Sequence, residues 1–487
     1  MIKSAASATP LYLAIDQGGH ASRAFIFNTA GVMLSRGTST IEAKTSANGH
    51  VEYSAKALLS SIHSAIQTAI SVPEVEVTEI IAAGIATQRA NIACWDKLTG
   101  KPLAPIISWQ DRRASHWIRN FHPHEKEVHQ ASGLFLSPHY GVGKLKWCFE
   151  NLPSVIEAYQ KKRLCWGPMS SFLLYQLLDG NPYLVDPVNA SRTLLWNIKN
   201  LDWDPSLITL FELPDNPLPS CVPNQHPFGT ITIAGHTIPM AIVIGDQSAS
   251  LFAWQQLQHD ALYINIGTGA FIQRVTDSDC VITPHLLTSL LLQKNNKPYY
   301  ALEGTVNGAG SALSWIEQQL KPKNLYQQLP QWLDENDNKM LFLNGIAGLG
   351  SPYWQPDFNS RFLGEGDDKQ KIVAIIESVA FLLQCNIEQL QIERPSATKI
   401  LISGGLAQLN GLCQRIADLS GLMVHRMAEC EATASGLAWL LREAQAESMA
   451  SSNHWKKHEV ELISPQRNEK LTARYRRWQL AMAQALN

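Results

Sequence analysis

Residues 13–31 read LAIDQGGHASRAFIFNTAG. Two apolar runs flank Asp16 and the pair Gly18-Gly19, a pattern typical of a β-hairpin with the glycines at its turn. A glycine turn also bares its backbone N–H groups, which can bind an anion, and a nearby carboxylate can hold a metal ion. The hairpin alone therefore leaves two interpretations open: a plain turn, or a phosphate-binding turn with a metal at Asp16.

Related patterns occur later in the chain. Residues 261–275, ALYINIGTGAFIQRV, again place a glycine turn between two apolar runs, and residues 398–409, TKILISGGLAQL, contain a strand that ends in a glycine pair. A duplicated hairpin predicts two related domains that face one another, with a ligand site between them. Three glycine turns favour a nucleotide as that ligand, although none matches a Walker loop or a dinucleotide fingerprint.

Strand-like runs alternate with helical patterns, which favours an α/β architecture. A helix is expected over residues 54–70, and the tail from Ser464 is expected to be helical. The domain boundary should fall within residues 239–253, where a strand delivers Asp246, and this divides the chain into domains at 1–250 and 251–487. Strands are expected over residues 11–17, 23–28, 31–37 and 80–88.

Length and composition limit the function classes. A chain of 487 residues is too long for one core, and a net charge of -2 gives no reason to expect nucleic acid or an anionic membrane as partner. No transmembrane run or secretory signal is evident. The eight cysteines form no CxxC pair, which predicts reduced thiols and a cytoplasmic protein. The sequence carries no interface signature, and a homo-oligomer is one expected state.

Together, these motifs resemble the FGGY family of carbohydrate kinases, and within it the glycerol kinases most closely. The resemblance runs in family order from Leu13 to about Leu440. It implies two ribonuclease-H-like domains, of the type found in actin, hexokinase and Hsp70, flanking a nucleotide cleft. Besides the hairpins, the matching stretches are GIATQRANIACWDKLTGKPLAPIISWQDRR, VNASRTLLWNIKNLDWD, IGDQSASLF, ALEGTVNGAGSALSWI, GLGSPYWQPDFNSRFLG and ISGGLAQLNG.

The resemblance implies ATP-dependent phosphorylation of a hydroxyl group on a small polyol or sugar, with Mg²⁺ as cofactor. Asp246 in "GDQ" is the implied catalytic base, because a carboxylate can accept the hydroxyl proton as the oxygen attacks phosphorus. Asp16 and Asp246 are the residues implied near Mg²⁺. The competing interpretations are a helix-capping Asp246 and a turn-forming Asp16.

The acceptor site and the base are assigned by resemblance to the N-terminal domain, and the nucleotide to the C-terminal domain. The competing interpretations are a surface arginine at Arg89, core aromatic residues at Trp109 and Phe271, and a plain exposed turn residue at His20. The implied acceptor-binding residues are Arg89, Trp109, His139, Asp246, Gln247 and Phe271. The implied nucleotide-binding residues are Gly18, Gly19, His20, Arg23, Gly267, Thr268, Gly269, Gly310, Ser314, Gly404, Gly405 and Leu409. Asp111, Arg112 and Arg113 are expected to scaffold the loop after Trp109 through ion pairs.

Several positions depart from the family pattern. The first turn usually carries two hydroxyl residues, but here Gly19 and His20 occupy those positions, and only Ser22 and Arg23 resume the pattern. Glycerol kinases have Glu where this chain has Ala90, and Tyr where it has His139, although Tyr140 lies next to it. An amide partner of the nucleotide becomes Ser314, and an Asn near the adenosine becomes Leu409, with Asn410 adjacent.

Loss of the glutamate removes a charged acceptor for small-polyol hydroxyls, which puts glycerol in question as the substrate. The altered first turn keeps open an alternative function, a catalytically weak binding or regulatory protein with the same fold. An actin-like or chaperone-like assembly protein ranks third, because the acceptor-side motifs do not favour it.

Overall fold

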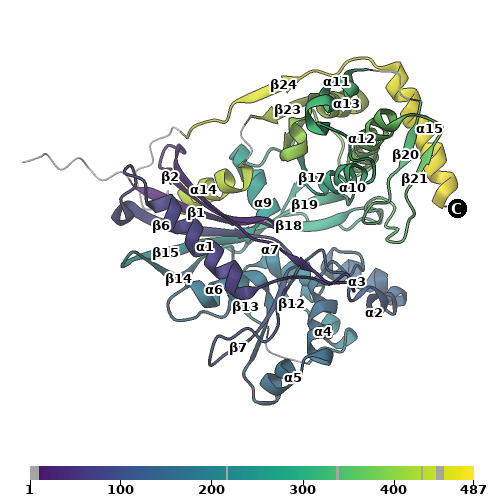
Figure 1. The fold of residues 1–487 in the computed structure, drawn as a ribbon. Helices are drawn as coiled ribbons and strands as arrows, with labels where there is room; N and C mark the ends of the chain where they lie inside the picture. The colour runs from purple at the N-terminus through teal and green to yellow at the C-terminus, as the bar shows by residue number, and fades with distance from the viewer. Residues whose placement is uncertain (1–9, 215–217, 336–338, 429–430, 446–454, 487) are drawn as a thin grey trace, which may run out of the picture.

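The computed structural model describes residues 10–214, 218–335, 339–428, 431–445 and 455–486, which form two halves, each built on a large mixed sheet (Figure 1). In the first sheet the strand order is β14-β15-β6-β1-β2-β3. The hairpin partner β2 is antiparallel to β1, whereas β6 and β15 continue the sheet in parallel on the other side of β1. Its strands are β1 (Leu11–Gln17), β2 (Ala21–Asn28), β3 (Met33–Thr40), β6 (Ile80–Thr87), β14 (Gln225–Ile233) and β15 (His236–Gly245).

The second sheet repeats this core and has the order β18-β19-β17-β16-β22-β23-β24. Here β16 is antiparallel to β17 and parallel to β22, which is parallel to β23. The predicted duplication and the α/β fold with two such domains are confirmed. The strands are β16 (Ala261–Ile266), β17 (Ala270–Asp277), β18 (Leu287–Lys294), β19 (Lys297–Val306), β22 (Lys399–Ser403), β23 (Met423–Met427) and β24 (Val460–Ile463).

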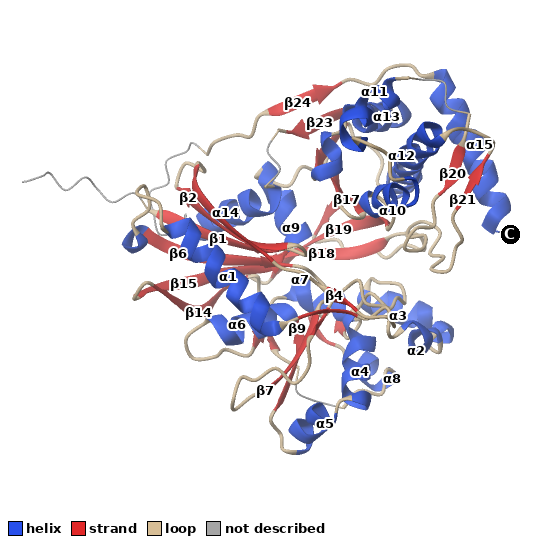
Figure 2. Ribbon diagram, viewed as in Figure 1, coloured by secondary structure: helices blue, strands red, loops and turns tan. Residues whose placement is uncertain are grey.

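Helices cover both sheets (Figure 2). The predicted helix is α1 (Ala55–Ile70); it begins at the N-cap Ser54 and packs on β2 and β3. In the second half, α12 (Asp368–Glu393) is long and apolar enough to span a membrane, but its most apolar window is 89% buried inside the protein, as in a core helix. The helical tail, α15 (Glu469–Leu486), is anchored by the buried Trp478. The other helices of the second half are α10 (Gly310–Leu320), α11 (Leu325–Asp334) and α13 (Asn410–Ser420).

Two helices connect the halves. Asp246–Leu251 forms α9 directly after β15, and α14 (Ala432–Gln445) returns from the second half to pack on α9, β1 and β6. The contact is close, because a Cβ at Gly436 would lie 1.8 Å from the carbonyl oxygen of Ala249. The part of the chain that follows the second sheet thus contributes to the core of the first half.

A smaller sheet, whose strands come from both before and after β6 in the chain, lies below the first sheet in Figure 1. It carries the loops that contain Trp109 and His139. Its strands are β4 (Lys44–Thr45), β5 (Val51–Tyr53), β7 (Ile92–Asp96), β8 (Ile106–Ile107) and β9 (Leu164–Pro168). Its helices are α2 (Ser115–Arg119), α3 (Glu125–Ser132), α4 (Gly141–Asn151), α5 (Pro153–Gln160) and α6 (Met169–Leu177), with α7 (Pro187–Ala190) and α8 (Pro205–Leu210) after them.

Candidate active site

Two carboxylates meet at the carboxyl edge of the first sheet. Asp16 lies near the end of β1 and Asp246 directly follows β15; parallel strands present these ends at one edge, where α/β proteins usually bind ligands. Burial and then the Asp246 charge raise the pKa of Asp16 to about 7, against the effect of Arg23, whose Nη1 lies 3.4 Å from Asp16 Oδ2. Burial also raises the pKa of Asp246, although Arg89 opposes it. The two acids therefore share one electrostatic environment.

Arg89 extends from the loop after β6 and is buried, so the surface-arginine interpretation is wrong. Its side chain crosses Gly245, where a Cβ would lie 2.8 Å from Arg89 Cγ. The guanidinium carbon lies 5.9 Å from the centroid of the half-buried Phe271 ring. Burial lowers the pKa of Arg89 to about 10, and its Nη1 has no hydrogen-bond partner among the described residues.

Trp109 and His139 form one wall, with their ring centroids 6.0 Å apart. The Trp109 N–H donates to Asn91 Oδ1 at 2.6 Å, and His139 Nδ1 donates to the Trp109 carbonyl at 3.0 Å. Burial lowers the pKa of His139 to about 4, so the ring is neutral near pH 7. Trp109 is half-buried rather than a fully enclosed core residue.

Lys144 on α4 supports this wall and was not predicted. Its fully buried Nζ donates to the carbonyls of Ala90 and His139 at 3.0 and 2.6 Å, two of the positions that depart from the family pattern. Burial lowers the pKa of Lys144 to about 7. A lysine within GVGKLKW carries no signal of burial in a single sequence, so only the tertiary structure shows this role.

A buried ionic cluster adjoins Arg89 and was also missed. Arg192 Nη2 donates to both oxygens of Glu303 on β19, at 3.1 and 2.9 Å, and this charge holds the pKa of Glu303 at about 2. The Tyr140 hydroxyl lies near this cluster: burial raises its pKa, and the charge of Arg192 opposes that rise. Arg192 and Glu303 lie in NASRT and ALEG, two stretches that resemble the family. The sequence of these stretches does not show that the two residues form an ion pair.

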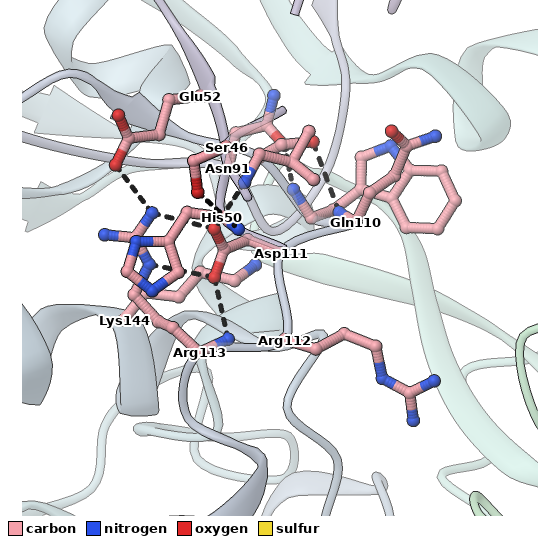
Figure 3. Close-up of polar contacts among 12 residues, drawn as sticks. Ser46, His50, Glu52, Asn91, Gln110, Asp111, Arg112, Arg113 and Lys144 are labelled. Carbon is pink, nitrogen blue, oxygen red and sulfur yellow. Dashed lines mark hydrogen bonds and ion pairs between the residues drawn. The ribbon is translucent and has the colours of Figure 1, made fainter. Parts of the chain in front are cut away.

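Asp111 and Arg113 scaffold the loop after Trp109, as predicted (Figure 3). Asp111 Oδ2 accepts from the Val51 N–H at 2.7 Å, and Arg113 donates to both Asp111 oxygens at 2.9 and 2.8 Å. Arg113 Nη2 also donates to Glu52 Oε1 at 2.6 Å. For Arg112 the prediction is wrong: its side chain makes no hydrogen bond or ion pair within the described part of the chain and points away from Asp111 in Figure 3, and only its backbone carbonyl is bonded, accepting from Ser115.

The first glycine turn is closed by its own backbone. The Gly18 N–H donates to the Ala21 carbonyl at 3.0 Å, and the Tyr53 hydroxyl donates to the Gly19 carbonyl at 3.1 Å. His20 is exposed. Ser22 does not replace the missing hydroxyls, because it is buried and its Oγ lies 2.8 Å from Ser61 Oγ.

The second glycine turn rests on the start of α10. The Gly310 N–H donates to the Gly267 carbonyl at 3.0 Å and the Ser311 N–H to the Thr268 carbonyl at 2.9 Å, while Gly267 N–H donates to Gly269 at 2.8 Å. A Cβ at Gly310 would lie 2.6 Å from the Gly267 oxygen, so only glycine permits this approach. Thr268 remains exposed at the tip.

The remaining predicted nucleotide contacts lie in the second half. Gly404 has a φ of +100° directly after β22, and, its chain neighbours aside, no described residue has an atom within 4 Å of a Cβ built on Gly405. Ser314 is exposed on α10, and Leu409 is half-buried before α13. The neighbouring Asn410 is engaged, since its Oδ1 accepts from Arg426 Nη1 at 2.7 Å. No hydrogen bond or ion pair between described residues joins the first turn to the second.

The chain is similar to known proteins both in sequence and in structure. A glycerol kinase of Streptococcus pyogenes serotype M5 is 31% identical over 440 residues, which cover 88% of this chain and 87% of that protein. The structure of Plasmodium falciparum glycerol kinase with ADP has a TM-score of 0.86 at 22% identity, covering 98% of this chain and 99% of the other. A ligand-bound xylulose kinase from Lactobacillus acidophilus has a TM-score of 0.81 at 17% identity, covering 96% of each chain.

Family models match both halves of the molecule. The N-terminal domain of the FGGY family of carbohydrate kinases matches residues 11–253, and the C-terminal domain matches residues 262–442. These matches span most of the chain and agree with the duplicated sheets. The chain therefore belongs to the FGGY family of carbohydrate kinases.

Proposed function

We propose that the protein transfers the γ-phosphoryl group of ATP to a hydroxyl of a small polyol or sugar. The observation that carries this proposal is the meeting of Asp16, Asp246 and Arg89 at one edge of the first sheet, next to Phe271 of the second half. Phosphoryl transfer depends on positioning and on neutralising charge, and this edge combines a base, a cation and an apolar wall. The acceptor is assigned to the N-terminal domain and the nucleotide to the C-terminal domain.

Asp246 is the base in this proposal. Its carboxylate takes the proton of the acceptor hydroxyl while the hydroxyl oxygen attacks the γ-phosphorus and the bond from phosphorus to the β,γ-bridging oxygen breaks, leaving ADP. A pKa raised by burial brings the base closer to neutral pH, where general bases work best. Arg89 Nη1 donates to an acceptor oxygen, and the unpartnered Gln247 Oε1 accepts from a second hydroxyl. Trp109, His139 and Phe271 form the walls.

Magnesium fits the two carboxylates. Mg²⁺ keeps several waters and needs only one or two carboxylates besides the substrate phosphates. Within the described residues no group of three or more His, Cys, Asp or Glu side chains could hold a metal, so Asp16 and Asp246 are assigned a site shared with the nucleotide. The bound ion would neutralise phosphate charge.

The two glycine turns are assigned to the phosphates. In the first half these are Gly18, Gly19, His20 and Arg23, and in the second they are Gly267, Thr268 and Gly269, supported by Gly310. The strand end at Gly404 and Gly405, together with Ser314 and Leu409, is assigned to the adenosine.

The test is ADP release from Mg-ATP with a panel of polyols and sugars. The proposal predicts acceptor-dependent ADP release, and no release above background with any acceptor would reject it. One observation favours a second candidate, a catalytically weak binding protein: the first turn presents no hydroxyl, since Ser22 is bonded to Ser61. Calorimetry separates the two, because tight acceptor binding without turnover supports the second candidate and rapid turnover excludes it.

The raised pKa of Asp16 predicts that nucleotide binding depends on pH. Because its pKa is raised to about 7, the carboxylate that magnesium needs is populated above pH 7 and lost as the pH falls below it. The KM for MgATP should therefore rise by up to about tenfold per pH unit below 7. Asp16→Asn should show a high KM with no such dependence. A wild-type KM that stays constant between about pH 6 and 8 would contradict this role.

The adjacent glycines Gly404 and Gly405 provide a matched pair of variants. Gly404→Ala should destabilise the fold, because φ is +100° and the new Cβ would lie 2.5 Å from the Ile266 carbonyl oxygen. Gly405→Ala has open space, so its melting temperature should stay near wild type while its KM for ATP rises. An unchanged KM in Gly405→Ala would remove this residue from the nucleotide site.

A further inference from the structure

The cluster around Glu303 has an unusual distribution of donors. Glu303 is 0% exposed, and its Oε2 accepts from Arg192 Nη2 at 2.9 Å, from Ser289 Oγ at 2.9 Å and from Gln273 Nε2 at 2.7 Å. A carboxylate oxygen offers about two lone pairs, so three donors saturate it. Oε1 accepts from Arg192 Nη2 alone among the bonds found within the described residues, at 3.1 Å.

Arg89 faces the saturated oxygen. Its Nη1 lies 3.7 Å from Glu303 Oε2, within range for charge attraction but beyond a hydrogen bond. The same Nη1 is buried and has no hydrogen-bond partner in the part of the chain that the structure describes. Glu303 therefore holds the Arg89 guanidinium in place by its charge, while the N–H that would otherwise bind it is left unbonded.

We infer that Ser289 is a positioning residue for the acceptor: by helping to saturate Glu303 Oε2, it prevents Arg89 Nη1 from bonding that oxygen and keeps it available for an acceptor oxygen. Gln273, opposite Glu303 on β17, and Arg192 act in the same way. The acceptor-site role of Arg89 rests on the proposed function. The network also ties this pocket to both halves, because Arg192 follows α7 while Ser289, Gln273 and Glu303 lie on β18, β17 and β19.

The test is Ser289→Ala, which removes one donor to Glu303 Oε2, together with the hydroxyl that accepts from Arg192 Nη2 at 2.6 Å, without removing charge. Arg89 Nη1 is expected to move onto the freed lone pair, so the KM for the acceptor should rise about tenfold, as for a lost hydrogen bond to a charged group. The KM for MgATP and the melting temperature should change little. Ser289→Thr keeps a hydroxyl and should restore the acceptor KM.

Ser191→Ala is the matched control, since this buried serine precedes Arg192 but its hydroxyl donates, among the described residues, only to the Val188 carbonyl, at 2.9 Å. It should leave the acceptor KM unchanged. A merely structural role of Ser289 would alter both Michaelis constants or the melting temperature rather than the acceptor KM alone. An acceptor KM in Ser289→Ala within twofold of wild type would overturn the inference.

A crystal structure of Ser289→Ala tests the inference even if no acceptor is phosphorylated. The expected result is a distance from Arg89 Nη1 to Glu303 Oε2 shortened from 3.7 Å to about 2.9 Å. A water molecule on Oε2 with Arg89 unmoved would overturn it. If the wild-type protein released no ADP while Arg89 shifted in the variant, the proposed function would be rejected. The inferred role of Ser289 in holding Arg89 would still stand.

Discussion

Asp246→Asn is expected to lower kcat by about 10²–10⁴-fold, the usual contribution of a general base. Asparagine has nearly the same shape and can still accept the Gln247 N–H, which Asp246 Oδ1 accepts at 2.7 Å, but it cannot take up the hydroxyl proton. Folding should be preserved. Because burial raises the pKa of Asp246, the folded state disfavours the charged carboxylate near neutral pH, and a neutral amide removes that cost.

The measurement is ADP release together with thermal unfolding of both proteins. Asp204→Asn is the control for losing a buried carboxylate elsewhere, since Asp204 caps α8 with its Oδ1 2.8 Å from the Ser206 N–H. It should keep wild-type kcat. If Asp246→Asn retained more than about a tenth of kcat, another group would have to be the base.

Ala90→Glu combined with His139→Tyr is expected to raise kcat/KM for glycerol by about 10–100-fold. A carboxylate restored beside Arg89 supplies a charged acceptor for the hydroxyls of a small polyol, and such hydrogen bonds contribute about 1.5–3 kcal/mol. Ala90 already has a φ of +63° and is buried beside the pocket, and Lys144 fixes its carbonyl, so the backbone need not change to present a longer side chain.

Each single variant serves as a control for the pair. Ala90→Glu alone should give most of the increase in kcat/KM for glycerol, because the glutamate carries the added charge. His139→Tyr alone should give little, since His139 contributes a neutral wall bonded to the Trp109 carbonyl. An unchanged kcat/KM for glycerol in the double variant would mean that other residues shape the pocket.

Local patterns predicted much of the fold. The hairpins, the helix that begins after Ser54 and the strand before Asp246 follow from alternating apolar residues and turn glycines, which act over short distances along the chain. The packing of α14 on the first half could not be predicted from the sequence, because the apolar residues of a helix do not indicate which sheet the helix covers. A similar limit applies to Arg112, since adjacent charges in DRR do not reveal which arginine meets Asp111.

At the site, the sequence predicted which residues come together more fully than it predicted the contacts that hold them in place. Asp16, Asp246 and Arg89 meet, as parallel strand ends and the family motifs imply, and their chemical roles stay predictions. Lys144 and Glu303 were missed because a buried charge is identified by its partners, and those partners are distant in sequence. Ser22, which continues the family pattern in sequence, is bonded to Ser61 instead.

The most direct measurement is ³¹P NMR of Mg-ATP incubated with the protein and the best acceptor of the panel. The account predicts that the γ-phosphorus signal is replaced by a phosphomonoester signal that is absent without the acceptor and absent with Asp246→Asn. Inorganic phosphate as the sole product, or an intact γ-phosphorus signal with every polyol and sugar, would contradict it.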